Sequence, residues 1–212
     1  LVPGRKATAK EILSFHSSEY VDAVATADSG DLQPDFNKFN LGSSDNPTYQ
    51  GIYHAALLST GATMKAVDLI LNRSIESAFS ISGGLHHAMP HYASGFCIFN
   101  DPVIAIKAFL NNGLKVAYID IDCHHGDGVQ YAFYDSDRVL NISIHESGDF
   151  LFPGTGFTNE IGSGKGRGYT INIPLYPYTG DEDYIWAFQE IVPKIMTKFN
   201  PDVLITQQGV DS

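Results

Sequence analysis

The sequence predicts an α/β domain built on a central, mostly parallel β-sheet. Four short apolar segments are rich in β-branched residues and are typical of strands buried on both faces: 115–122, 138–145, 169–175 and 202–209. Helical patterns separate several of these segments, as in a sheet that is covered by helices. With 212 residues, 43% of them hydrophobic, the chain is long enough for a sizeable core, so residues 1–212 are expected to form one domain.

Helical periodicity is expected in four further segments: 9–25, 52–72, 102–112 and 181–199. Gly61 lowers the helix propensity of the second segment without removing its pattern. Pro193 is expected to kink or interrupt the fourth, because proline lacks the N–H that a helix interior uses. Residues 26–50 are polar and rich in glycine, aspartate and asparagine, so they are expected to form a long loop.

The composition narrows the classes of partner. The formal net charge is −11, which disfavours direct binding to nucleic acid and favours cationic ligands such as lysine-rich tails or polyamines. Alternatively, the acidic residues only increase solubility and do not bind a partner. Two cysteines are too few for a disulfide scaffold. Without a signal peptide or an apolar run long enough to span a bilayer, the chain is expected in the cytoplasm, with no membrane partner.

The segment YIDIDCHHGDG, residues 118–128, carries the densest set of chemically active side chains. Alternate residues of a strand share a face, so Asp122 and His124 could bind one cation from the same side. A carboxylate, an imidazole and one more oxygen ligand leave coordination positions open, as in catalytic zinc sites. A lone Asp-x-His more often caps a helix, but here two histidines and three carboxylates fall within eight residues.

A third metal ligand is expected at another strand end, because open α/β sheets place their sites at the carboxyl ends of strands. Asp211 follows the apolar segment 202–209 and meets that requirement, although an aspartate there could also cap a helix. The sequence thus predicts a zinc site formed by Asp122, His124 and Asp211. Fe²⁺ in place of Zn²⁺ stays open, because this ligand set is not strongly selective.

A second cluster lies in GGLHHAMPHYASGFCIFND, residues 83–101. His86 and His87 suit the base and the acid that a hydrolase needs near neutral pH. Asp120 and Asp127 are not used by the metal in this interpretation and could hold the far nitrogen of each imidazole. Three other histidines are expected to be structural or exposed: His91, His125 and His145.

Five motifs, in this order, resemble the histone deacetylase superfamily: GGLHHA, ASGFCIFND, DIDCHHGDGVQ, FPGTG and QQGVDS. The resemblance covers residues 10–212 and is strongest to class I histone deacetylases and prokaryotic acetoin utilization proteins. It implies a three-layer arginase/deacetylase-type fold and a single catalytic domain that removes acetyl groups from amines with zinc. The family's metal ligands fall on the same three residues. Its histidine pair falls on His86 and His87, with His87 as general base and His86 as an electrostatic or acid partner.

The resemblance also implies groups that hold the substrate. The aromatic walls of the family's acyl-lysine tunnel fall on Phe96 and Phe152, the carbonyl that accepts the substrate amide N–H on Gly95, and a rim aspartate on Asp45. Two structural sites for a monovalent cation, K⁺ or Na⁺, are implied as well. The first would use Asp120, Asp122, His124, Ser143 and Ile144, and the second Phe133, Ser136, Val139 and Tyr169.

The chain departs from the family pattern at its C-terminus. The family's oxyanion-stabilising tyrosine lies downstream of the third ligand, and this chain ends one residue after Asp211. We therefore expect a fragment, incomplete at the C-terminus and at the N-terminus. Its own activity should be weak or absent, since losing one oxyanion donor costs about two to three orders of magnitude in rate.

Parts of the sequence are also compatible with four other functions. An acetylpolyamine amidohydrolase would use the same site on another acetylated cationic substrate. A non-catalytic module that binds acetylated amines is favoured by the missing tyrosine. A two-manganese ureohydrolase needs a bridging carboxylate where this chain has Gly126, and ranks lower. A cysteine nucleophile, Cys97 or Cys123, ranks lowest, because Cys123 would face away from the metal.

Overall fold

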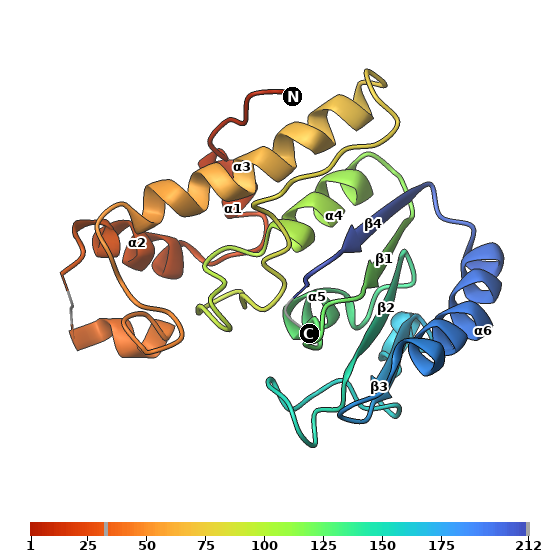
Figure 1. Cartoon of the computed structure of the whole chain (residues 1–212). Coiled ribbons are helices and arrows are strands. Elements are labelled where there is room, and N and C mark those ends of the chain that lie inside the picture. Colours follow the sequence, from red (N-terminus) through yellow and green to blue (C-terminus); the bar gives the residue numbers. More distant parts are fainter. Residues whose placement is uncertain (32–33, 211–212) are drawn as a thin grey trace. The chain divides into compact units, whose positions relative to one another are not determined.

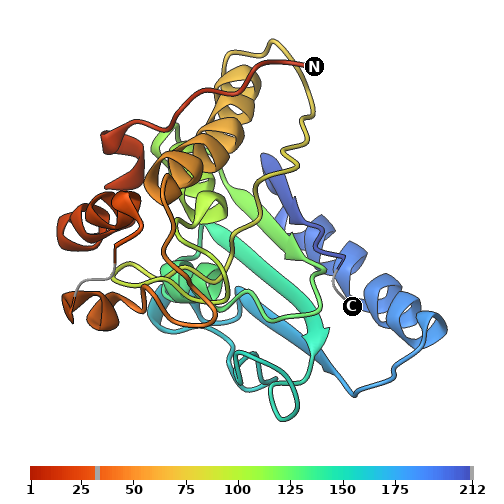
Figure 2. The same ribbon diagram turned by 60° about the vertical axis from the view of Figure 1, so that its left-hand side comes forward.

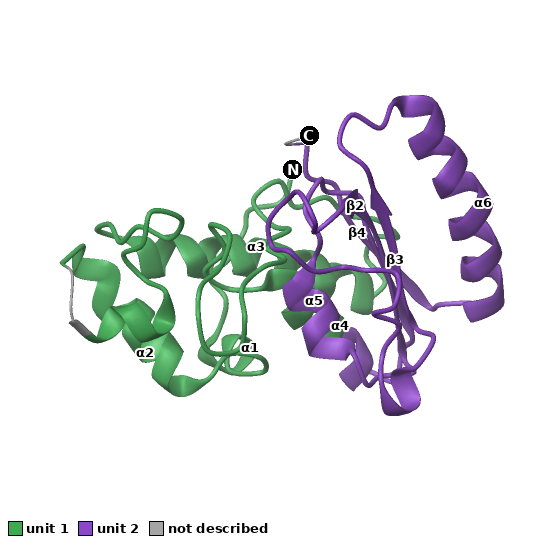
Figure 3. Cartoon of the chain, turned by 90° about the horizontal axis from the view of Figure 1, so that it is seen from below, with its two compact units in different colours: residues 1–108 green, residues 109–212 purple. Residues whose placement is uncertain are grey.

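The computed structural model describes residues 1–31 and 34–210. The chain forms two compact units, Leu1–Ala108 and Phe109–Ser212, which are coloured separately in Figure 3. Each unit has its own set of fully buried side chains. That one catalytic domain spans residues 1–212 stays a prediction.

The first unit is helical. Its elements are α1 (Ala9–Ile12), α2 (Ser18–Thr26), the 3-10 helices η1 (Ala27–Ser29) and η2 (Pro34–Phe39), α3 (Ile52–Leu71) and α4 (Asp101–Asn111), whose end belongs to the second unit. The helices expected at 52–72 and 102–112 are confirmed to within one residue. The prediction of a long loop at 26–50 was wrong in part, because this segment contains the short helices η1 and η2.

The helix expected over 9–25 is divided into α1 and α2. The Ser17 hydroxyl accepts the backbone N–H of Tyr20 and so caps a new helix. The break turns His16 inward, where its ring packs against Tyr20 and Phe99 at centroid distances of 5.5 and 5.2 Å. Local capping thus decides the break that the apolar periodicity does not show.

Gly61 marks a close crossing inside α3. A Cβ at this position would overlap the carbonyl oxygen of Arg5 and the backbone nitrogen of Ala7. The N-terminal segment runs directly against the helix there, and the Ala7 N–H donates to Leu57 O at 2.8 Å. The glycine therefore serves packing, at a cost to helix propensity of about 1 kcal/mol.

The second unit is a four-stranded parallel sheet in the order β3-β2-β1-β4 (Figures 1 and 2). Its elements are β1 (Val116–Asp120), α5 (Asp127–Phe133), β2 (Val139–Glu146), η3 (Gly164–Gly166), β3 (Thr170–Leu175), α6 (Asp181–Phe199) and β4 (Val203–Gln207). All four expected strands are present, with ends shifted by one or two residues. The α/β class with a parallel central sheet is confirmed.

One face of this sheet is apolar and packs against α6, which lies along it in Figure 1. Leu140, Ile142 and Ile144 of β2 contact Val192 and Phe199 of the helix in a single buried cluster. Burial of each such side chain contributes roughly 1.5–3 kcal/mol. This cluster holds α6 against the sheet and so stabilises the strands whose ends carry the candidate site.

The opposite face is buried but polar. Its nearly or fully buried polar residues are Tyr118, Asp120, Asn141, Ser143, His145, Thr170 and Asn172. Helix α5 covers this face, and its Gln130 accepts a hydrogen bond from Asn172 of β3 at 2.7 Å. The sequence predicted strands that are apolar on both faces. In the structure, the buried polar groups instead lie together on one face, which leads to the candidate site.

Pro193 does not interrupt α6, so the interruption that was one of the two expected outcomes is wrong. The helix runs continuously from Asp181 to Phe199. Burial of Val192 and Phe199 against the sheet offsets the roughly 3 kcal/mol that a proline costs inside a helix. Within the part of the chain that the structure describes, no helix combines the length and apolar character needed to cross a bilayer.

Candidate active site

Two aspartates close successive turns where β1 ends. The backbone N–H of Asp122 donates to Oδ1 of Asp120 at 3.1 Å, and that of His124 donates to Oδ1 of Asp122 at 2.8 Å. Such side-chain-to-backbone bonds compete with a strand ladder, so the strand stops at Asp120. The expected strand alternation holds for Tyr118 and Asp120, whose side chains bond at 2.7 Å, but it does not extend to His124.

The turn, rather than the strand, brings Asp122 and His124 together. Oδ1 of Asp122 lies 3.2 Å from Nδ1 of His124. Two ligands of one tetrahedral zinc ion, each about 2.0–2.2 Å from the metal, lie about 3.3–3.6 Å apart. The pair therefore fits a shared zinc ion in both donor type and separation, with Asp122 only 5% exposed.

The end of β4 orients the other oxygen of the same carboxylate. Gln207 donates from Nε2 to Oδ2 of Asp122 at 3.0 Å. A Cβ at Gly209 would overlap Oδ2 of Asp122, so only glycine lets the chain pass there. Sequence reasoning missed both roles, although the glycine in QQG was the available signal.

The third predicted ligand, Asp211, lies outside the described residues. Among residues 1–31 and 34–210, no three histidine, cysteine, aspartate or glutamate side chains are grouped so that they could hold a metal. The described structure therefore brings together two of the three predicted ligands, and Asp211 stays a prediction.

Asp101, which the sequence analysis did not single out, holds the start of the histidine-rich loop. It is 1% exposed, and its carboxylate accepts Thr63 Oγ1 at 2.6 Å, Gly84 N at 3.1 Å and Leu85 N at 2.9 Å. Burial raises the pKa of this carboxyl above its usual value, against the hydrogen bonds, which lower it. The side chain thus fixes the backbone just before His86.

Asn100 holds the next part of that loop. Its Nδ2 donates to His86 O and Ala88 O, each at 3.0 Å, and its backbone N–H donates to Nε2 of His16 at 3.0 Å. His16 in turn faces Met89 O through Nδ1 at 3.0 Å, so the ring carries its proton on Nδ1. Neither Asn100 nor His16 was assigned a role from the sequence.

His86 and His87 are held close together and away from solvent. They are 3% and 5% exposed, and their ring centroids lie 4.0 Å apart. Of their predicted partners, Asp120 is fully buried, while Asp127 begins α5 and accepts the N–H of Gly128 at 3.0 Å. The histidines belong to one unit and the aspartates to the other, so their pairing stays a prediction.

Gly95 and Phe96 form the tip of a tight turn. Ser94 and Cys97 exchange backbone hydrogen bonds of 2.8 and 3.2 Å across it, and both tip residues have positive φ, +50° and +66°. This is the two-residue hairpin turn that normally selects asparagine and glycine. Phe96 therefore occupies a backbone region that is costly for its side chain, and it is 76% exposed.

Phe152, the other predicted tunnel wall, lies next to a predicted metal ligand. Its ring centroid is 6.3 Å from that of His124, in an edge-on arrangement, and the side chain is 43% exposed. The peptide bond that follows it, to Pro153, is cis. Asp45 is exposed and accepts the Ser44 hydroxyl at 3.3 Å, so its side chain is accessible to a ligand.

Residues of the two predicted cation sites all lie in the second unit. Asp120 pairs with Ser143 in the register of β1 and β2, which places the strand end and the Ser143 hydroxyl side by side. For the second site, the Phe133 carbonyl accepts the N–H of Ser136 at 3.0 Å, and the Tyr169 carbonyl accepts that of Asn141 at 2.8 Å. Both cation sites stay predictions.

Three other histidines and the two cysteines differ in their exposure. His91 is exposed, and His125 and His145 are 1% exposed. Cys97 is buried, and its Sγ contacts Gly95 O at 3.2 Å, while Cys123 is partly buried.

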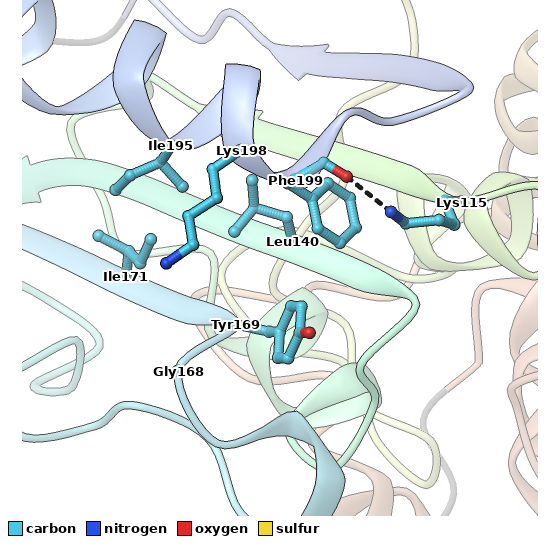
Figure 4. Close-up of a pocket in the computed structure, with 8 residues that line it drawn as sticks. All are labelled: Lys115, Leu140, Gly168, Tyr169, Ile171, Ile195, Lys198 and Phe199. Carbon is cyan, nitrogen blue, oxygen red and sulfur yellow. Dashed lines mark hydrogen bonds between the residues drawn. The ribbon is translucent and has the colours of Figure 1, made fainter.

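A cavity of about 410 Å³ lies at the other end of the strands, between α6 and the sheet (Figure 4). Its lining is mainly apolar: Lys115, Leu140, Gly168, Tyr169, Ile171, Ile195, Lys198 and Phe199. Lys115 donates from Nζ to Phe199 O at 2.6 Å and lies 4.3 Å from the centre of that ring. The cavity thus lies at the amino ends of the strands, whereas Asp122 and His124 lie at the carboxyl ends.

Comparisons with known proteins agree with one another. The histone deacetylase domain model matches residues 1–212. Acetoin utilization protein AcuC of Bacillus subtilis is 42% identical over 214 residues, covering 100% of this chain and 55% of that protein. Histone deacetylase HDAC1 of Drosophila melanogaster is 41% identical over 210 residues, covering 98% of this chain and 40% of that protein.

The similar solved structures belong to the same family as the similar sequences. The crystal structure of an HDAC homolog from Aquifex aeolicus is 37% identical with a TM-score of 0.91, and the match covers 97% of this chain and 56% of that one. An HDAC homolog complexed with SAHA matches with a TM-score of 0.92 at the same identity and coverage. The arginase/deacetylase-type fold implied by the motifs is confirmed, and the chain spans about half the length of the curated relatives it matches.

Proposed function

Because this chain belongs to the histone deacetylase family, we propose that it takes part in zinc-dependent hydrolysis of the acetyl amide of acetyl-lysine or a related acetylated amine. The observation that most supports this is the pair at the end of β1. Oδ1 of Asp122 and Nδ1 of His124 lie 3.2 Å apart, a separation suited to two ligands of one zinc ion.

In this proposal Asp122, His124 and Asp211 hold the metal. A bound zinc ion would polarise the acetyl carbonyl and lower the pKa of the attacking water. Gln207 keeps one carboxylate oxygen of Asp122 in a fixed direction, and Gly209 leaves room for it. Fe²⁺ could occupy the same ligands.

The histidine pair moves the protons. His87 takes a proton as water attacks, and His86 stabilises charge or returns a proton to the departing amine. Asp120 and Asp127 would each hold the far nitrogen of one ring and fix its tautomer. Support for this comes from the buried, closely spaced rings, which the hydrogen bonds of Asn100 and Asp101 keep in place.

The proposed substrate carries an acetylated amine, which is uncharged, within an otherwise cationic molecule such as a lysine-rich tail or a polyamine. Phe96 and Phe152 would line its aliphatic stem, the Gly95 carbonyl would accept its amide N–H, and Asp45 would hold the backbone of a peptide substrate. The formal charge of −11 favours a lysine side chain or a polyamine over an anionic ligand. Monovalent cations at the two predicted sites would stiffen the segment that bears the metal ligands.

The test is acetate release from acetyl-lysine peptides and acetylated polyamines by the intact protein, measured beside its metal content. His87→Ala should lower kcat by about two to four orders of magnitude while the bound zinc is unchanged. His91→Ala is the matched control, because His91 is exposed, and should behave as the wild type. Full turnover in His87→Ala would refute the assignment of the base, and two manganese ions per chain would favour a ureohydrolase.

A further inference from the structure

Glu160 joins two parts of the second unit from a half-buried position. Its Oε1 accepts the backbone N–H groups of Gly156 and Phe157, each at 3.0 Å. Its Oε2 accepts Nε2 of Gln130, on α5, at 2.5 Å. Burial raises the pKa of this carboxyl, but these hydrogen bonds outweigh that effect and lower the pKa below its usual value, so Glu160 is ionised near neutral pH.

An ionised carboxylate can only accept hydrogen bonds. Glu160 therefore fixes the orientation of the Gln130 amide and, through it, the tautomer of His125. The amide nitrogen of Gln130 must face Glu160, so its Oε1 faces the other way. That oxygen accepts Nδ2 of Asn172 at 2.7 Å and lies 3.1 Å from Nε2 of His125. His125 must therefore carry its proton on Nε2, and its Nδ1, at 2.8 Å, accepts the Thr155 hydroxyl.

A second imidazole packs against this ring at an interplanar angle of 48°. His145 donates from Nε2 to Gly156 O at 3.0 Å, and its Nδ1 accepts the Ser143 hydroxyl at 2.8 Å. The centroids of His125 and His145 lie 4.8 Å apart. A Cβ on Gly156 would overlap both rings, so the loop backbone lies directly on them.

The hydrogen bonds themselves assign both rings as neutral. Nε2 of each ring faces an oxygen that only accepts, on Gln130 for His125 and on Gly156 for His145, and each Nδ1 accepts a hydroxyl.

We propose that Glu160 is a positioning residue. Through Gln130 it sets the Nε2–H tautomer of His125, and this makes the Thr155 hydroxyl the donor that ties the loop bearing Phe152 to the segment next to the metal ligand His124. The loop is short, since Thr155 follows Phe152 by three residues. Its significance for turnover rests on the proposed function, but the tautomer itself does not.

A merely structural role makes a different prediction. If Glu160 only caps the N–H groups of Gly156 and Phe157, the isosteric Glu160→Gln keeps both bonds through its amide oxygen and changes little else. If Glu160 instead sets the direction of the hydrogen bonds through Gln130, the NH₂ group of the new glutamine would face the NH₂ group of Gln130, and two donors repel. Gln130 must then turn its oxygen to position 160 and present its NH₂ group to His125, which drives the proton to Nδ1.

The swap Glu160→Gln with Gln130→Glu restores the pattern. A carboxylate at position 130 accepts from the new glutamine, from Nε2–H of His125 and from Asn172. Glu190→Gln is the matched control, because Glu190 is exposed and its ion pair with Lys194 is far along α6. The control should match the wild type in every measurement.

The decisive measurement is the nitrogen NMR shifts of the His125 ring, which distinguish its two tautomers without any activity. The wild type and the swap should show Nε2–H, and Glu160→Gln should show Nδ1–H. In Glu160→Gln the Thr155 hydroxyl should therefore turn from donor to acceptor and receive the Nδ1–H of His125, and the swap should restore it as the donor.

The outcomes separate the two proposals. An Nδ1–H ring in the wild type would overturn the positioning role even if no variant folds. So would an unchanged ring in Glu160→Gln, or a swap that fails to restore Nε2–H. If the variants show the expected tautomer changes but the intact wild-type protein releases no acetate, the positioning of His125 is supported and the deacetylase function is refuted.

Discussion

The backbone N–H of Asn100 donates to Nε2 of His16 across 3.0 Å, although 84 positions separate the two in the chain. His16 is 2% exposed, and Asn100 is fully buried. Through this bond, the break between α1 and α2 is tied to the residue that holds the backbone of His86. The loop that carries the predicted base is thus supported from two distant parts of the first unit.

This support should make stability depend on pH. Burial lowers the pKa of His16 to about 3, whereas the unfolded ring titrates near 6.5. Between these values only the unfolded state binds the proton. Stability is therefore complete above about pH 6.5 and falls by about 1.4 kcal/mol per pH unit, from this residue, as the pH is lowered.

His16→Asn should remove that part of the slope. Urea unfolding between about pH 7 and about pH 5 measures it, since other buried histidines contribute equally to both proteins. His54→Asn, at an exposed position of α3, is the control and should keep the wild-type slope. Equal slopes for His16→Asn and wild type would contradict the assignment.

Asn100→Ala should destabilise the chain by about 2–4 kcal/mol, because it leaves two buried carbonyl groups, on His86 and Ala88, without their donor. Asn37→Ala, at an exposed position, should change stability by less than about 0.5 kcal/mol. The free energy of unfolding in urea tests both. An equal, small effect for the two variants would show that the loop is held by other contacts.

Phe96→Gly should stabilise the fold while impairing substrate binding. A non-glycine residue in the left-handed region costs about 1–3 kcal/mol, and glycine removes most of it. Phe79→Gly is the matched control, because Phe79 is equally exposed, at 76%, without a positive φ. That variant should lose stability. A raised melting temperature with a raised KM is the expected result for Phe96→Gly, and a lowered melting temperature would refute the strain.

Gly209→Ala should weaken zinc binding by about 10- to 100-fold, because its methyl group must displace the Asp122 carboxylate. Gly180→Ala is the control, since nothing lies within 4 Å of a Cβ there. Competition with a chelating dye measures the affinity of each protein. Unchanged affinity in Gly209→Ala would mean that Asp122 is not a ligand.

The order of the elements could be predicted from the sequence, because helix and strand periodicity depend on neighbouring residues. The four strands, α3 and α4 were found in this way. The predicted helix boundaries were wrong where a cap or a tertiary contact outweighed the local sequence pattern. Ser17 divides the first helix by capping, and burial of α6 against the sheet keeps the helix continuous through Pro193.

By itself, the sequence determined the fold class, the family motifs and the two residues, Asp122 and His124, that the structure brings within 3.2 Å. Tertiary structure alone decided which other residues serve the site. Gln207, Asn100 and Glu160 hold groups up to 85 positions away, and nothing in their local sequence states which partner they meet. A hydrogen bond depends on distance and direction in space, so these roles exist only once the chain is folded.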